Sequence, residues 1–263
     1  MEQCSNYTTA QGVCKLSIQL YFAFSPEEAA AASRSGHPTA CLGYRLAADA
    51  PALLAPQTEV PAGCRMVLQD STLPSYPPTM ALARLIAQYA SSCHSGILCD
   101  FDRSPALFWQ EFLPMLETAC GDAGLPLWVP AAYGSCAPRC PVILPSDCVE
   151  GTFIRHLERS ATANPQGCVL ELRPLACRIA LPCLTEPQRL SRTDAEEQIA
   201  RCSSVGFSEP LCCHWGLLSS DPVTVLLWDD RISLSRKLDA AQRAGFLAAV
   251  GLLQELGGDF PSK

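Results

Sequence analysis

Short apolar segments alternate with amphipathic segments along most of the sequence. Apolar runs bounded by Pro, Gly, Ser or Asp predict strands over 16–24, 41–46, 64–69, 96–101, 125–132, 141–144, 168–172, 179–181 and 223–228. Apolar residues at a helical spacing predict helices that begin near residues 25, 79, 104, 152, 193 and 233. Residues 247–253 fit either more helix or a closing strand. This alternation constrains the fold more than any single motif.

Repeated strand–helix pairs form right-handed βαβ units around a mostly parallel sheet. About eight repeats in roughly 250 residues fit a closed (β/α)8 barrel better than an open doubly wound sheet. We therefore predict an α/β fold: one (β/α)8 TIM-type barrel domain over 1–263, with an inserted segment over 184–230 before the last βα unit. No G-x-G-x-x-G follows the first strand, which disfavours a dinucleotide-binding fold, and we expect no cofactor.

Composition excludes several classes of protein. Hydrophobic residues make up 48% of the chain and charged residues 17%, whereas a disordered chain needs low hydrophobicity and high charge. The net charge of -7 argues against binding to nucleic acid, which needs clustered Lys and Arg. No apolar stretch reaches the length of about 18 residues that a membrane span needs. The first residues, MEQCSNY, lack the basic and apolar regions of a signal peptide, so we expect a protein made in a reducing compartment such as the cytoplasm.

The chain contains 16 Cys, many of them within apolar runs, where they fit as small buried thiols. Two groups could suggest a metal site: Cys136, Cys140 and Cys148, and the run Cys212-Cys213-His214. Neither group has the C-x2-C spacing that is typical of structural zinc sites. We therefore expect no bound metal at these cysteines.

In a (β/α)8 barrel the functional residues lie at the C-terminal ends of the strands. The polar residues at the predicted strand ends are Asp70, Asp100, Asp102, Tyr133, Asp147, Glu171, Arg173 and either Gln254 or Glu255. Any one of them alone is more often the start of a solvated loop than a functional residue. Asp100 and Asp102 are two positions apart at the end of a strand, so both should face the barrel mouth. Repulsion between them should raise the pKa of one carboxyl, as a general acid requires.

The segment that contains this pair, SGILCDFDRS over 95–104, resembles the fourth strand of the family-18 glycoside hydrolases, which are chitinase-like (β/α)8 barrels. The likeness is greatest to the bacterial branch that includes spore-cortex N-acetylglucosaminidases, whose motif is D-G-x-D-x-D-x-E. Asp100 matches the last Asp, which orients the acetamido group of the sugar, and Asp102 matches the Glu that donates the proton. Ser95 and Leu98 replace the first two Asp residues.

Two later segments extend the resemblance. Residues 225–238, VLLWDDRISLSRKL, are similar to the "vWFdDarSl.aKl" segment of that branch. Residues 177–182, CRIALP, are similar to its seventh strand, and the Trp that forms the floor of the sugar site falls on Leu253 or nearby. The 184–230 insertion would then form a wall of the cleft, like the small α+β insertion of the family.

The resemblance implies a retaining mechanism in which the acetamido oxygen of the substrate attacks the anomeric carbon. Asp102 would be the acid and Asp100 the orienting carboxylate, with Asp70, Tyr133, Glu171 and Arg173 as substrate-binding residues. Because Asp is one methylene shorter than Glu, the carboxyl of Asp102 would lie about 1.5 Å short of the leaving oxygen. A misplacement of about 1 Å can lower a rate about a hundredfold.

We therefore expect a protein directed at N-acetylglucosamine-containing glycans of the peptidoglycan or chitin type, with weakened or lost hydrolysis. The alternative is a non-catalytic protein of the spore or cell envelope that binds a glycan or a protein partner. A third reading is a different barrel enzyme, in which the carboxylates of Asp70, Asp100, Asp102 and Glu171 surround a divalent metal.

Overall fold

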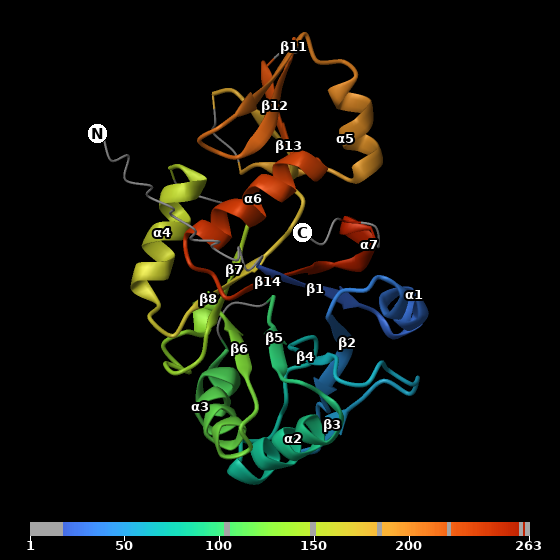
Figure 1. Cartoon of the computed structure of the whole chain (residues 1–263), viewed down its shortest axis with the longest axis vertical. Coiled ribbons are helices and arrows are strands. Elements are labelled where there is room, and N and C mark those ends of the chain that lie inside the picture. The colour runs from blue at the N-terminus through green and yellow to red at the C-terminus, as the bar shows by residue number, and fades with distance from the viewer. Residues whose placement is uncertain are drawn as a thin grey trace, which may run out of the picture.

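A closed parallel barrel forms the body of the protein (Figure 1). The computed structural model describes residues 18–102, 106–147, 151–182, 186–219, 222–257 and 260. Within them the barrel strands are, in order, β1 (Gln19–Phe24), β2 (Thr39–Leu46), β4 (Arg65–Gln69), β5 (Ile97–Asp100), β6 (Leu127–Pro130), β7 (Val142–Pro145), β8 (Cys168–Glu171) and β14 (Ala248–Leu252). The barrel closes because β1 pairs in parallel with both β14 and β2. The (β/α)8 fold that the sequence predicts is confirmed, and residues 248–252 are the closing strand.

Helices cover the outside of the barrel. They are α1 (Ala29–Arg34), which continues the 3-10 turn η1 (Pro26–Glu28), α2 (Met80–Cys93), α3 (Leu107–Asp122), α4 (Phe153–Ala163), α6 (Arg231–Arg243) and the short α7 (Leu253–Leu256). A further 3-10 turn, η2 (Ala131–Tyr133), follows β6, and the two-residue strand β3 (Leu53–Leu54) pairs antiparallel with β2. None of the helices in the described part of the chain is both long and apolar enough to cross a bilayer.

Two predicted helix starts were wrong by two residues. Ser191 caps α5 (Arg192–Ile199) by accepting the N–H of Asp194, so this helix begins before the predicted start at Thr193. Asp230 caps α6, and its side chain accepts the N–H of Ser233, the residue at which we expected the helix to begin. In both cases a Ser or Asp upstream of the predicted start, Ser191 or Asp230, is the residue that caps the helix. The predicted start of α3 at Ser104-Pro105 lies outside the described residues.

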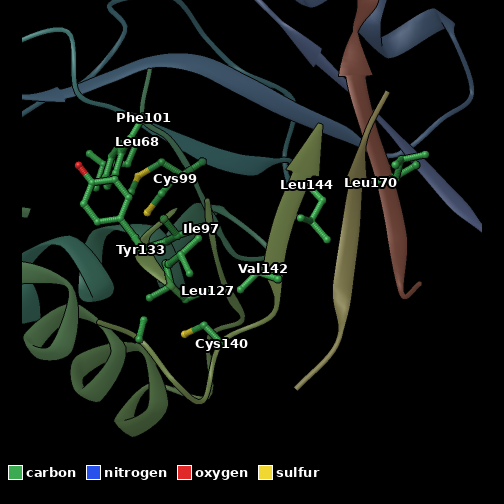
Figure 2. Close-up of a cluster of buried hydrophobic side chains, with 14 of the residues drawn as sticks. Leu68, Ile97, Cys99, Phe101, Leu127, Tyr133, Cys140, Val142, Leu144 and Leu170 are labelled. Carbon is green, nitrogen blue, oxygen red and sulfur yellow. The ribbon is translucent and has the colours of Figure 1, made fainter. Parts of the chain in front are cut away.

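The apolar side chains form two cores. One fills the barrel interior and contains Ala23, Ala40, Val67, Leu98, Trp128, Ile143, Val169, Ala248 and Val250. The larger core lies between the barrel wall and the surrounding helices, and Figure 2 shows part of it, including Phe101 and Tyr133. Barrel strands are buried on both faces, which explains their continuous apolar runs.

A second sheet lies beyond α6 at one end of the molecule (Figure 1). It is antiparallel, with the order β10 (Gln188–Arg189), β9 (Ala176–Ala180), β13 (Thr224–Trp228), β12 (Cys213–Leu218) and β11 (Ser204–Ser208), and α5 contacts β9 and β13. It is inserted between β8 and the last helix–strand pair of the barrel. The division of the chain into one domain over 1–263, with an insertion over 184–230, stays a prediction.

Residues 177–182 are not the seventh barrel strand, as their resemblance suggested. They overlap β9, which pairs antiparallel with β13 in the second sheet, whereas the seventh barrel strand is β8. The reason lies in burial: β8 is the apolar run CVLE, buried along almost its whole length, whereas β9 carries the exposed Arg178 in its centre. A charged side chain suits one exposed face of an antiparallel sheet but not a barrel strand.

A buried polar cluster joins the second sheet to the barrel. The carboxylate of Asp229, just after β13, accepts the N–H of Leu175 at 2.9 Å and the hydroxyl of Ser233 at 2.8 Å. It also pairs with Lys237 of α6, whose Nζ lies 2.6 Å from Oδ2. Lys237 Nζ donates in addition to the carbonyl of Ser146, just after β7. The segment over 225–238 therefore supplies the buried polar contacts that hold the second sheet against the barrel.

Candidate functional site

A cleft of about 570 Å³ opens at the C-terminal ends of the barrel strands. Four polar residues that the sequence singled out line it: Asp100, Asp102, Glu171 and Arg173. The deeper part of the cleft is aliphatic and includes Leu98, Ile143, Val250 and Leu252. The active sites of (β/α)8 enzymes lie at this end of the barrel, so the cleft is the natural candidate site.

Asp100 ends β5 and is half-buried in the cleft. Its Oδ2 accepts a hydrogen bond of 3.2 Å from Nε2 of Gln69, and the Gln69 side-chain oxygen accepts the N–H of Gly43 at 3.1 Å. Burial, and then the charge of Asp102, raise the pKa of the Asp100 carboxyl. Of the two carboxyls, the raised pKa belongs to Asp100, and burial contributes more to it than the repulsion between the two carboxylates.

Asp102 lies two residues further on, exposed at the cleft. Its backbone N–H donates to Oδ1 of Asp70 at 3.1 Å. This bond fixes the backbone where the chain leaves β5, so both carboxylates of the pair open into the same cleft. Strand geometry points the side chains of residues two positions apart to the same face.

Glu171 ends β8, and Arg173 follows it in the same cleft. Arg173 donates to Oε1 of Glu171 from Nη2 at 2.6 Å and from Nε at 2.9 Å. Burial raises the pKa of Glu171, and the neighbouring guanidinium opposes this shift. The N–H of Arg173 also donates to the hydroxyl of Ser146 at 2.9 Å, which fixes the backbone of this residue.

The structure places Asp70 and Tyr133 away from the cleft surface. Neither is among the cleft-lining residues that the structure describes. Asp70 is buried beneath Asp102, whose N–H it accepts. Tyr133 is fully buried, packs edge-on against Phe101 at 5.3 Å between ring centroids, and accepts the N–H of Ala106 at 3.2 Å (Figure 2). These two residues therefore hold the chain at 102 and at 106, on either side of the segment that follows the carboxylate pair.

One cleft residue was missed from the sequence, and another was expected only as an alternative. Arg189 reaches the cleft from β10 and forms an ion pair with Asp147. No sequence signal pointed to it, because it belongs to the second sheet. Gln69 is not among the described lining residues, but it donates to the cleft carboxylate of Asp100, and its inward alternation with Val67 in β4 could have identified it. Glu255 lies in α7, just after β14, and lines the cleft, where burial raises the pKa of its carboxyl.

The cleft offers little aromatic surface. Among its described lining residues, Phe101 is the only aromatic one. Leu253, at the position expected for the family's Trp, is buried, and its neighbour Leu252 lines the cleft instead. Aliphatic side chains do not offer the flat ring on which a sugar stacks. Within the described ranges, no three His, Cys, Asp or Glu side chains are grouped closely enough to hold a metal ion.

No protein-family model matches the sequence, and no curated protein matches it. Solved structures do match the fold. The C-terminal domain of a putative chitinase from Desulfitobacterium hafniense superposes with a TM-score of 0.58 at 9% identity, over 93% of this chain and 96% of that one. A family-18 N-acetylglucosaminidase from Paenibacillus barengoltzii gives 0.57 at 10% identity, over 89% and 94%. The Bacillus cereus spore cortex-lytic enzyme SleL gives 0.56 at 13% identity, over 89% and 70%. The chain therefore has the barrel fold of the family-18 glycoside hydrolases.

Proposed function

We propose that this protein is a glycoside-hydrolase-like protein directed at N-acetylglucosamine-containing glycans of the peptidoglycan or chitin type. One observation carries the proposal: Asp100 and Asp102 leave the fourth barrel strand, β5, into the cleft of a family-18 barrel fold. Glu171 and Arg173 complete a polar rim around them. The names of structural neighbours, an N-acetylglucosaminidase and spore cortex-lytic enzymes, support this substrate class and a place in the spore or cell envelope.

The proposed chemistry is substrate-assisted hydrolysis with retention of configuration. Asp102 gives its proton to the glycosidic oxygen as the bond from that oxygen to the anomeric carbon breaks. The acetamido oxygen of the same sugar forms a bond to the anomeric carbon and yields an oxazolinium intermediate, which water then opens. Asp100, whose pKa is raised, is suited to share a proton with the acetamido N–H and to hold the group in place.

Two features support weak hydrolysis rather than efficient hydrolysis. The side chain of Asp102 is one methylene shorter than the Glu of the family, and a misplacement of about 1 Å can lower a rate about a hundredfold. The described cleft also lacks a Trp or Tyr ring on which the distorted sugar could stack. These same features favour a second candidate, a protein that binds the glycan without cleaving it.

The experiment is the hydrolysis of aryl N-acetylglucosaminides and chitooligosaccharides by four proteins: the wild type, Asp102→Asn, Asp102→Glu and the control Asp122→Asn. Asp122 is an exposed carboxylate at the far end of α3. A weakened enzyme predicts that turnover is abolished by Asn, raised by Glu and unchanged in the control. If neither the wild type nor Asp102→Glu shows turnover, the binding protein is the better account. Turnover that survives Asp102→Asn contradicts the role of Asp102.

A further inference from the structure

The two faces of the second sheet differ in how they are covered. Gly216 of β12 and its cross-strand partner Leu226 share one face. Cys202, just after α5, packs against this face, because a Cβ at 216 would stand 2.6 Å from its Sγ, and Leu226 is only 1% exposed. Trp215 and its partner Leu227 point to the other face, and both are only half-buried. The sheet therefore carries α5 on one side and presents Trp215 on the other (Figure 1).

Trp215 lies flat on this second face. Its partner on β11 is Gly206, and a Cβ at 206 would stand 2.8 Å from three atoms of the indole, Nε1, Cε2 and Cζ2. Equal distances to three ring atoms mean that one face of the ring rests on the glycine. The other face of the ring is then turned away from the sheet. A side chain at 206 would lift the indole, so the glycine is what allows the ring to lie down.

The face that carries Trp215 continues the wall of the cleft. Cross-strand pairing places Arg189, Cys177, Leu227, Trp215 and Gly206 in one row across the sheet. Directly paired residues point to the same face. Arg189, at one end of the row, lines the cleft. Trp215 is three strands further along, about 14 Å away at the usual spacing of about 4.8 Å between strands. A polymer that leaves the cleft beside Arg189 can therefore run along this row to the indole.

We propose that Trp215 is a second glycan-binding platform, outside the cleft, on which a sugar of a longer N-acetylglucosamine-containing chain stacks. The inference rests on the proposed function, since the occupant is the part of the same glycan that extends beyond the cleft. A pyranose ring has a flat face of C–H groups, which suits the electron-rich face of an indole. Phe101 is the only aromatic residue among the described lining of the cleft, so Trp215 supplies a stacking surface that the cleft itself offers sparingly.

Comparison of a short and a long ligand tests the proposal, with binding followed by isothermal titration calorimetry. The wild type should bind hexa-N-acetylchitohexaose about tenfold more tightly than tri-N-acetylchitotriose, the scale of one well-placed Trp contact. Trp215→Leu should lose this gain and keep its affinity for the trisaccharide, which shows that the fold and the cleft are intact. Trp215→Phe retains an aromatic ring and should keep part of the gain.

The matched control is Trp228→Leu. Trp228 belongs to the same sheet but pairs with His214 and stacks on it, on the face opposite Trp215. This variant should keep the full gain from chain length. A gain that is lost equally in Trp228→Leu and Trp215→Leu would overturn the proposal, because a general disturbance of the sheet would then explain both.

Three further results would overturn the platform. The first is equal affinity of the wild type for the two oligosaccharides, which needs no variant to fold. The second is a gain that survives in Trp215→Leu. The third is a change in oligomeric state of Trp215→Leu, measured by light scattering, with unchanged affinity for the hexasaccharide, which would assign this face to contacts between copies of the chain. Failure of the proposed function is distinct, because the wild type would then bind neither oligosaccharide.

Discussion

Lys237 and Asp229 form a fully buried ion pair at the joint between the barrel and the second sheet, with Nζ 2.6 Å from Oδ2. Both side chains have almost no exposure, 1% and 0%. Lys237 also donates to the carbonyl of Ser146, and Asp229 also accepts from Leu175 and Ser233. The pair therefore connects the end of β7, the residue just before β9 and α6. A satisfied network of this kind fixes one arrangement of the elements that it joins.

Removal of one partner of this pair should destabilise the protein strongly. Lys237→Met leaves the Asp229 carboxylate buried without its counter-charge, and such losses are about 3–5 kcal/mol. We expect a loss of that size in the free energy of unfolding, measured by urea denaturation. The matched control is Arg192→Met, which breaks an exposed ion pair with Glu196 and should change stability by less than about 1 kcal/mol. Equal effects of the two variants would contradict the role of the buried pair.

Tyr133 should matter for stability and not for ligand binding. Tyr133→Phe keeps the buried ring but removes the hydroxyl that accepts the N–H of Ala106. We expect a loss of about 0.5–1.5 kcal/mol in the free energy of unfolding, the usual net value of one hydrogen bond. Affinity for chitooligosaccharides should stay within about twofold of the wild type, since a change below 0.4 kcal/mol corresponds to that factor. A large loss of affinity without a loss of stability would place Tyr133 in the binding site after all.

The raised pKa of Asp100 predicts that replacement of Asp100 by a neutral residue stabilises the fold. The size of this gain in stability should depend on pH. Because the folded chain holds the proton of Asp100 more tightly than the unfolded chain does, ionisation of Asp100 destabilises the fold as pH rises through the folded pKa. Below the ordinary carboxyl pKa, near 4, this destabilisation is absent. We therefore expect Asp100→Asn to be more stable than the wild type at neutral pH, by a margin that shrinks toward acid pH. Thermal unfolding at several pH values measures this margin, with Asp122→Asn as control. A margin that grows toward acid pH would contradict the direction of the shift.

The ion pair with Arg173 should limit how far the pKa of Glu171 is raised. Burial raises the pKa of Glu171, and the charge and hydrogen bonds of Arg173 oppose that rise. Arg173→Met should therefore move the pKa of Glu171 further upward, as measured by NMR titration of the labelled carboxyl carbon. Arg189→Met, which removes a cleft arginine paired with Asp147, serves as the matched control and should shift Glu171 less. An unchanged Glu171 pKa in Arg173→Met would show that the ion pair does not persist in solution.

The barrel could be predicted because its strands are buried on both faces. Runs such as CVLE in β8 and ILCD in β5 are almost continuously apolar, and the sequence shows this directly. The second sheet was harder to recognise because three of its strands, β9, β12 and β13, are also short and largely apolar. Only the exposed Arg178 within β9 distinguishes that strand from a barrel strand, and a resemblance to the family's seventh strand concealed this signal.

The candidate site was predictable where it depends on strand ends alone. Asp100, Asp102, Glu171 and Arg173 follow barrel strands, and the closure of the barrel brings them to one cleft. Asp70 and Tyr133 satisfy the same rule, yet their side chains accept backbone N–H groups from residues 102 and 106 beneath the surface. A sequence shows where a strand ends, but it does not show whether the last polar side chain turns toward solvent or toward a backbone donor.

Binding of tri-N-acetylchitotriose, followed by isothermal titration calorimetry, tests the central claim most directly, because it does not depend on catalysis. We expect one site per chain in the wild type, at least tenfold weaker binding by a cleft variant that combines Asp100→Asn with Glu171→Gln, and unchanged binding by Asp122→Asn. No detectable binding to the folded wild-type protein, or equal binding by the cleft variant, would contradict the account of this cleft as a site for N-acetylglucosamine-containing glycans.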